Sequence, residues 1–97
     1  MKSIITDSKK CYFCLRTPTE KHHCLYGRAN RRKADKYGLT VQLCREHHTG
    51  KNGVHTHRPD LDLKLKQIAQ KCFEETYSRE KFIEEFGKSY IYGGTNG

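Results

Sequence analysis

The sequence LTVQLCREHH, residues 39–48, decides the fold, because it joins a strand pattern to a pair of metal-ligand side chains. Residues 39–43 alternate between apolar and polar side chains, which is the period of a half-buried β-strand. Cys44 and His47 follow at once, with two residues between them. A knuckle of this kind places two ligands on one tight turn, and a tetrahedral site needs a second knuckle to complete it.

The second knuckle lies upstream, in the sequence CYFC at residues 11–14. Two such knuckles indicate zinc, since thiolates and imidazoles are its preferred ligands. The sequence therefore predicts one structural zinc site with the ligands Cys11, Cys14, Cys44 and His47. His48 is an alternative fourth ligand, although the two-residue spacing favours His47. Cys24 and Cys72 fall among apolar residues, and we expect buried thiols there.

The composition limits the size of the core. The chain has 97 residues, only 34% of them apolar, and no Trp. We therefore expect residues 1–97 to form one domain that a metal helps to hold together. No secretory apolar segment opens the chain, and no apolar run approaches the roughly 18 residues of a membrane span. These features favour a reducing compartment, where a C-x-x-C pair indicates a metal more often than a disulfide.

Glycine residues divide the middle of the chain into short elements. A short strand is expected before Gly27, and alternating apolar and polar residues predict a second strand after Gly38. The basic segment between them tolerates a helix, and a short helix follows the second strand. We expect these elements at residues 20–26, 28–37, 39–43 and 44–50.

Two further helices are predicted towards the C-terminus. We expect one over residues 59–77, with an apolar stripe between Leu61 and Phe73 that covers the strands. The other should lie between Ser78, its cap, and Gly87, its end. A short extended piece over residues 89–92 and a loose tail at 93–97 would follow.

The net charge of +8 indicates a polyanionic partner, with nucleic acid as the first candidate. Lysine and arginine are densest over residues 28–36. Basic side chains there would contact phosphates without distinguishing base sequence, and a solvated basic loop is the alternative. The expected DNA-binding residues are Arg28, Arg31, Arg32, Lys33, Arg45 and Lys51.

Histidines lie close in sequence to the predicted zinc ligands. Zinc binding would bring His22 and His23, in the first strand, close to His48. Hydrolysis of a phosphodiester needs a divalent metal that stabilises the leaving oxygen and a base that deprotonates water. Neutral imidazole can act as a ligand or as a base near pH 7. The three histidines therefore indicate a metal-dependent nuclease.

The order of these motifs resembles a known family. The layout C-x-x-C, x-H-H-x, strand, L-C-x-x-[CH]-H is similar to that of the HNH (ββα-metal) endonucleases with a zinc ribbon, and the similarity extends from Cys11 to about His55. The sequence YGLTVQLCREHHTGKNGVH, followed by LKQIAQKCFEE and FIEEFGKSY, resembles phage-encoded members, including the recombination-enhancement nuclease branch.

The resemblance implies an α+β fold, with a ββα-metal (HNH) core and a structural zinc site over residues 11–55, followed by two packing α-helices over residues 59–92. It implies DNA as the substrate, Mg²⁺ or Mn²⁺ as the catalytic ion, and products with 5′-phosphate and 3′-hydroxyl ends. At the matching positions, His22 and His48 would bind the catalytic metal and His23 would be the general base. The expected location is the cytoplasm of a bacterial or phage-infected cell.

Two departures from the family pattern affect the site. Leu39 stands near the position of the usual middle Asn and cannot hydrogen-bond, so Asn30 or a backbone carbonyl would have to replace that Asn. Gly50 and Gly53 cut short the helix that usually carries a further ligand. His55 would then either return as that metal ligand or contact DNA.

A third departure concerns the histidine pair. Strict strand alternation would send His22 and His23 to opposite faces of the strand. Both can serve one site only if the strand ends or bulges there, and the roles of ligand and base could then be exchanged. His57 has no assigned role.

The rival interpretation is a non-catalytic zinc-ribbon module that binds nucleic acid or a protein partner, and the missing Asn is its best support. Tyr12, Phe13 and Tyr26 are expected to pack rather than to stack on bases. A domain of this size has little surface for recognising a long site. A homodimer or a recruiting protein would then supply the targeting.

Overall fold

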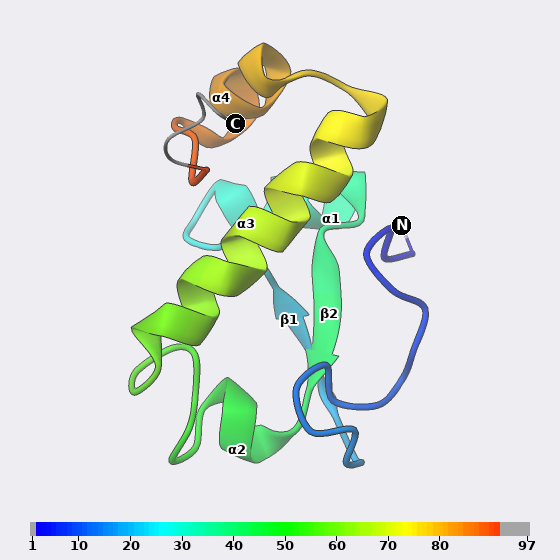
Figure 1. Ribbon diagram of the computed structural model, residues 1–97, viewed down its shortest axis with the longest axis vertical. Helices are drawn as coiled ribbons and strands as arrows, with labels where there is room; N and C mark the ends of the chain where they lie inside the picture. Colours follow the sequence, from blue (N-terminus) through cyan, green and yellow to red (C-terminus); the bar gives the residue numbers. More distant parts are fainter. Residues whose placement is uncertain (1, 92–97) are drawn as a thin grey trace.

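An antiparallel pair of strands lies at the centre of the computed structural model, which describes residues 2–91 (Figure 1). β1 (Glu20–His23) pairs with β2 (Thr40–Leu43), and Glu20 at the start of β1 is opposite Leu43 at the end of β2. The elements follow one another in the order β1, α1, β2, α2, α3, α4, so one helix connects the two strands and three helices come after them. The expected α+β class is confirmed.

Helix α1 (Asn30–Tyr37) joins the two strands, and Gly38 ends it with a φ of 72° in the left-handed region. A side chain at Gly38 would also clash with the backbone carbonyl of Lys2. The N-terminal segment lies this close because the Ile4 N–H donates to the Gly38 carbonyl at 2.8 Å. Only glycine satisfies both the backbone conformation and the close approach.

β1 is shorter than the strand predicted over residues 20–26. Cys24 and Leu25 are both fully buried. In a strand of a sheet with one covered face, neighbouring side chains point to opposite faces, so only one of the two would be buried. The chain therefore bends after His23, and the Cys24 N–H donates to the Leu39 carbonyl at 3.0 Å. This bend ends the strand at the histidine pair.

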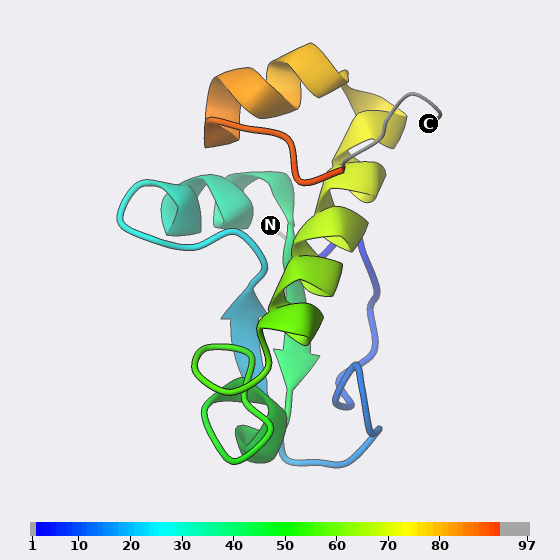
Figure 2. The ribbon, with the colours of Figure 1, turned by 60° about the vertical axis from the view of Figure 1, so that its left-hand side comes forward.

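The remaining helices lie close to their predicted ranges. α2 (Arg45–His48) is a single turn, α3 (Pro59–Thr76) begins at its proline, and α4 (Arg79–Phe86) is capped by Ser78, whose Oγ accepts from a backbone N–H at 3.0 Å. Figure 2 shows α3 crossing the strand pair, with α4 folding back above α1. Within residues 2–91, none of these helices combines the length and apolar character needed to cross a membrane.

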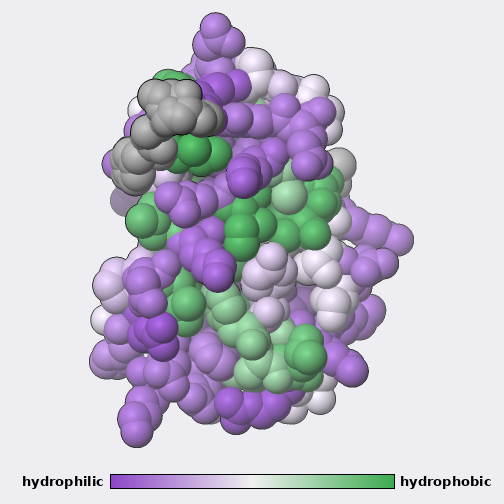
Figure 3. Space-filling model, in the orientation of Figure 1, coloured by the Kyte–Doolittle hydropathy of each residue, from purple (hydrophilic) through white to green (hydrophobic). Residues whose placement is uncertain are grey.

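Aromatic side chains form the centre of the core. Phe73 on α3 is fully buried, and its ring centroid lies 5.1 Å from that of Tyr37 on α1 and 5.4 Å from that of Phe82 on α4. One residue thus joins three helices. Figure 3 shows hydrophilic side chains over most of one face and apolar residues in a band across its middle, as expected when little apolar mass is available.

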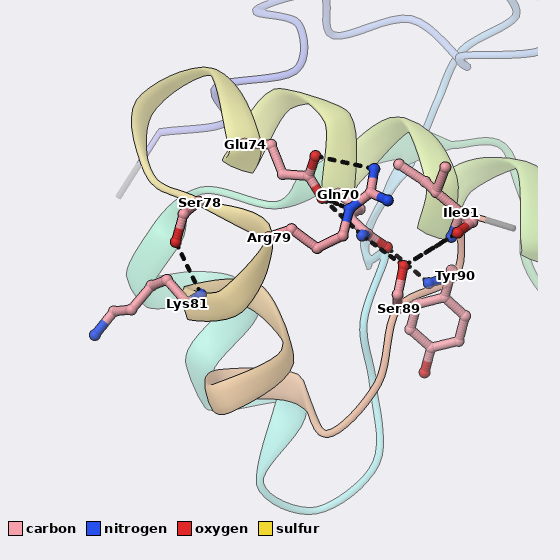
Figure 4. A network of polar contacts seen from close by, with 8 residues as sticks. All are labelled: Gln70, Glu74, Ser78, Arg79, Lys81, Ser89, Tyr90 and Ile91. Carbon is pink, nitrogen blue, oxygen red and sulfur yellow. Dashed lines mark hydrogen bonds and ion pairs between the residues drawn. The ribbon is translucent and has the colours of Figure 1, made fainter. Parts of the chain in front are cut away.

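A buried glutamine attaches the C-terminal end of the described chain to α3 (Figure 4). Gln70 accepts from the Tyr90 N–H at 2.7 Å and donates to Ser89 Oγ at 2.9 Å and to Glu74 at 2.8 Å. These bonds satisfy both polar atoms of a side chain with no exposed surface. The extended piece predicted at residues 89–92 is not a strand over 89–91, and Tyr92 and the predicted tail lie outside the described residues.

The position of Phe73 predicts a large loss of stability on truncation. Replacing Phe73 with Ala should lower the free energy of unfolding by about 3–5 kcal/mol, because a cavity would open between three helices. Ile83→Ala, at a side chain 40% exposed on α4, should cost less than about 1 kcal/mol. Urea denaturation of the metal-loaded protein measures both values. Equal losses would contradict the central place of Phe73.

Candidate metal centres

Four ligand atoms converge where the N-terminal knuckle meets the end of β2. Sγ of Cys14 lies 3.7 Å from Sγ of Cys44, which lies 3.3 Å from Nδ1 of His47. Sγ of Cys11 completes the group, and all four atoms lie within 4.8 Å of one another. Two sulfurs each about 2.3 Å from a tetrahedral ion would be about 3.8 Å apart. This Cys3His cluster could therefore bind a metal such as zinc, with His47 rather than His48 as the fourth ligand.

Backbone hydrogen bonds hold the first knuckle against β2. The Tyr12 N–H donates to the Gln42 carbonyl at 2.9 Å, and the Leu15 N–H donates to the Cys11 carbonyl at 2.9 Å. Hydrogen bonds from Arg16, first through its backbone N–H and then through its guanidinium, lower the pKa of the Cys14 thiol to about 6. The knuckle thus favours the thiolate form that a metal requires.

The two other cysteines lie outside this cluster. Cys24 is fully buried, and burial raises the pKa of its thiol to about 12, so it stays protonated. The prediction of a buried thiol is confirmed for Cys24. Cys72 is only partly buried, because it lies at the edge of the apolar stripe of α3 rather than at its centre.

Loss of one ligand should empty the Cys3His cluster. We expect Cys44→Ser to lower the zinc content by one ion per chain relative to the parent and to lower the melting temperature, since bound metal contributes folding free energy. Cys72→Ser, the matched control outside the cluster, should keep the parent's zinc content. Mass spectrometry of the metal in purified protein measures this. An unchanged zinc content in Cys44→Ser would contradict the assignment.

A second group of three histidines lies on the other side of α2. His22 comes from β1, His48 from α2, and His55 from the loop between α2 and α3, and one nitrogen of each lies within 4.8 Å of the others. The Nε2 atoms of His48 and His55 are 3.2 Å apart. Two imidazole nitrogens on one ion, each at about 2.0–2.1 Å, would be about 2.9–3.4 Å apart. We call these three residues the histidine triad.

The burial and the protonation state of His22 also suit a metal ligand. Its side chain is 1% exposed, and its Nε2 atom is buried without a hydrogen-bond partner among residues 2–91. Burial first, and then the charges of His48 and His55, lower the pKa of His22 to about 3. The imidazole is therefore neutral near pH 7, with a buried nitrogen available for an ion.

A carboxylate orients one member of the triad. Glu20 Oε1 lies 2.7 Å from Nδ1 of His48, whose Nε2 faces His55. This bond lowers the pKa of Glu20 and fixes the imidazole so that Nε2 is directed towards the other histidines. Glu20 could not be recognised from the sequence, because only the strand register, in which Glu20 is opposite Leu43, places it beside α2.

The loop after α2 returns His55 to the triad. α2 ends at His48, and Val54 is buried with its N–H bonded to the His47 carbonyl at 2.9 Å. A Cβ atom at Gly53 would lie 2.9 Å from the carbonyl oxygen of His48, so the turn needs glycine. The prediction of a truncated helix is confirmed, and His55 joins the other histidines. His57 is exposed and lies outside both clusters.

His22 and His23 line the same cleft, whose volume is about 930 Å³. Both can do so because β1 ends at His23. His23 Nε2 faces Asp35 of α1 at 3.1 Å and is not part of the triad. Asp35 could not be recognised from the sequence, since nothing in its own segment marks it as a partner of a strand residue.

The six expected DNA-binding residues lie in three different surroundings. Arg28, Arg31 and Arg32 line the cleft beside the histidines, whereas Arg45 and Lys51 are exposed elsewhere. The Lys33 ammonium donates to the Glu85 carbonyl at 2.6 Å and so joins α1 to α4. Leu39, near the position at which the HNH resemblance leads us to expect an Asn, is fully buried in the core.

Tyr26 and its neighbours close one side of the cleft. The Tyr26 ring lies 4.9 Å from that of His55, and the Lys66 ammonium of α3 lies 4.7 Å from the Tyr26 ring centroid. Tyr26 therefore packs against the triad, and α3 takes part in its surroundings.

Gly53 provides a test of the triad that leaves its ligands unchanged. We expect Gly53→Ala to weaken Mn²⁺ binding at least about tenfold, because the clash with backbone atoms would displace His55 from the other two histidines. Thr56→Ala, in the same loop and exposed, should bind like the parent. Isothermal titration of protein loaded with one zinc per chain measures the affinity. Equal affinity in Gly53→Ala would rule out the role of His55.

Comparison with known proteins gives no relative: no protein-family model, curated protein or solved structure matches this chain.

Proposed function

We propose that this protein is a metal-dependent DNA endonuclease of the HNH (ββα-metal) type. The observation that carries the proposal is the convergence of three histidines that could hold a metal ion and a fourth histidine, His23, on one cleft lined by arginines. Neither a zinc-ribbon scaffold nor a basic DNA-binding surface alone would need the buried nitrogen of His22 that has no hydrogen-bond partner within residues 2–91.

The donor set fits a divalent ion. His22, His48 and His55 would hold it, with Glu20 orienting His48 from behind. A divalent ion bound there supplies a positive charge that polarises the phosphate and stabilises the leaving oxygen. Three neutral imidazoles suit Mn²⁺ or another transition ion better than Mg²⁺, which prefers oxygen ligands. Of the two ions expected from the family resemblance, we therefore favour Mn²⁺.

His23 would act as the general base. Its imidazole accepts a proton from a water molecule, the water oxygen bonds to phosphorus, and the P–O3′ bond breaks. The 3′ oxygen leaves and takes a proton from solvent, which gives 5′-phosphate and 3′-hydroxyl ends. The roles of ligand and base follow from position: His22 is a member of the triad, whereas His23 lies outside it on the same cleft.

Arginines at the cleft would bind the DNA backbone. Arg28 and Arg32 are exposed, and Arg31 lies beside them near the start of α1. Their guanidinium groups can hold phosphates on either side of the bond that is cut, without recognising bases. Binding should accordingly weaken as the salt concentration rises.

Cleavage of supercoiled plasmid with Mn²⁺ tests the function. We expect the zinc-loaded parent to nick the plasmid and His23→Ala to be at least about 100-fold slower, because general bases contribute roughly 10²–10⁴ in rate. His57→Ala, which alters an exposed histidine outside the site, should cleave like the parent.

Two outcomes would count against the proposal. Full activity in a His23→Ala protein that keeps its zinc would exclude His23 as the base. No cleavage by the parent, with DNA still retained in a gel shift, would favour a non-catalytic zinc module that binds nucleic acid.

A further inference from the structure

A general base needs a partner that orients it. An imidazole accepts a proton at one nitrogen only when the other carries the hydrogen, and a hydrogen-bond acceptor next to that other nitrogen selects this tautomer. Leu39 cannot supply such a partner, because its aliphatic side chain is enclosed in the core. The partner of His23 must therefore come from elsewhere in the fold.

Asp35 is the group that faces His23. Its Oδ2 atom lies 3.1 Å from Nε2 of His23. Nε2 is buried, and no residue among 2–91 makes a well-aligned hydrogen bond to it, so the carboxylate faces Nε2 at a close distance but not at an ideal angle. Hydrogen bonds of catalytic groups are often poorly aligned before substrate binds.

Strand alternation places Lys21 beside the same carboxylate. Lys21 and His23 are two residues apart in β1 and point to the same side, whereas His22 points to the other two members of the triad. The Lys21 ammonium lies 2.6 Å from Oδ1 of Asp35. Lys21 first, and then His23, hold the pKa of the Asp35 carboxyl below its usual value, so it is ionised near neutral pH.

Helix α1 holds Asp35 in a fixed position. Ala34 and Tyr37, on either side of it in the helix, are buried, and the Leu39 N–H donates to the Ala34 carbonyl at 2.8 Å. Figure 2 shows α1 above the end of β1, where His23 lies. The carboxylate thus stands on a regular element that is packed on the core.

We propose that Asp35 is the positioning residue for His23: its carboxylate accepts a hydrogen bond from Nε2–H and leaves Nδ1 free to take the proton of the attacking water. This role rests on the proposed nuclease function, because it assigns a task to the base of that reaction. Asp35 thereby replaces the missing Asn with a charged acceptor from the connecting helix.

The tautomer of His23 tests the proposal without requiring activity. Nitrogen-15 NMR of the zinc-loaded protein at about pH 8, with the His23 signal assigned by comparison with His23→Gln, should show hydrogen on Nε2. Asp35→Ala should shift His23 towards the Nδ1–H form. A parent whose His23 carries hydrogen on Nδ1, or a tautomer that Asp35→Ala leaves unchanged, would overturn the proposal.

Kinetics provides the second measurement. We expect Asp35→Ala to lower kcat about 10- to 100-fold, the range found for outer-shell partners of histidine, with KM for DNA and the affinity for Mn²⁺ within about twofold of the parent. Asp35→Asn, whose amide oxygen can still accept from Nε2–H, should recover part of kcat. Asp60→Asn, the control at an exposed carboxylate paired with Arg58, should match the parent.

The outcomes separate the two proposals. A parent without nuclease activity whose His23 tautomer still depends on Asp35 would refute the function and leave the positioning intact. An active parent whose kcat is unaffected in Asp35→Ala would refute the positioning and leave the function intact. A joint fall in zinc content, Mn²⁺ affinity and kcat would show that Asp35 serves folding only and would also overturn the positioning role.

Discussion

The joining of the N-terminal knuckle to the end of β2 is the constraint on which the rest of the site depends. Cys11 and Cys14 meet Cys44 and His47 there, and a metal such as zinc could cross-link the two segments. α2 begins immediately after Cys44 and is a single turn. Neighbouring residues on a helix point about 100° apart, so fixing His47 in one cluster directs His48 to the other.

The side chains of the short strand β1 also point to two different places, in the same way as those of His47 and His48 on α2. His22 points into the triad, while Lys21 and His23 point towards Asp35 on α1. Because β1 ends at His23, the two histidines still open onto one cleft. The proposed ligand and the proposed base are thus held by different partners, although they are adjacent in the chain.

The C-terminal helices compensate for a chain with few apolar residues. Phe73 joins α3 to α1 and α4, so the helix that carries Asp35 is packed on the aromatic core. α3 also places Lys66 against Tyr26, at the border of the triad. These helices therefore stabilise the domain, and α3 also contributes to the surroundings of the triad.

The sequence by itself determined the features that depend on local spacing: the four members of the Cys3His cluster, the glycine that ends α1, and the limits of α3 and α4. Each follows from residues a few positions apart, whose geometry the backbone fixes. Only the tertiary structure decided the pairs Glu20–His48, His23–Asp35 and Lys33–Glu85 and the return of His55. These contacts join different elements, so they depend on strand register and helix packing, which no local pattern encodes.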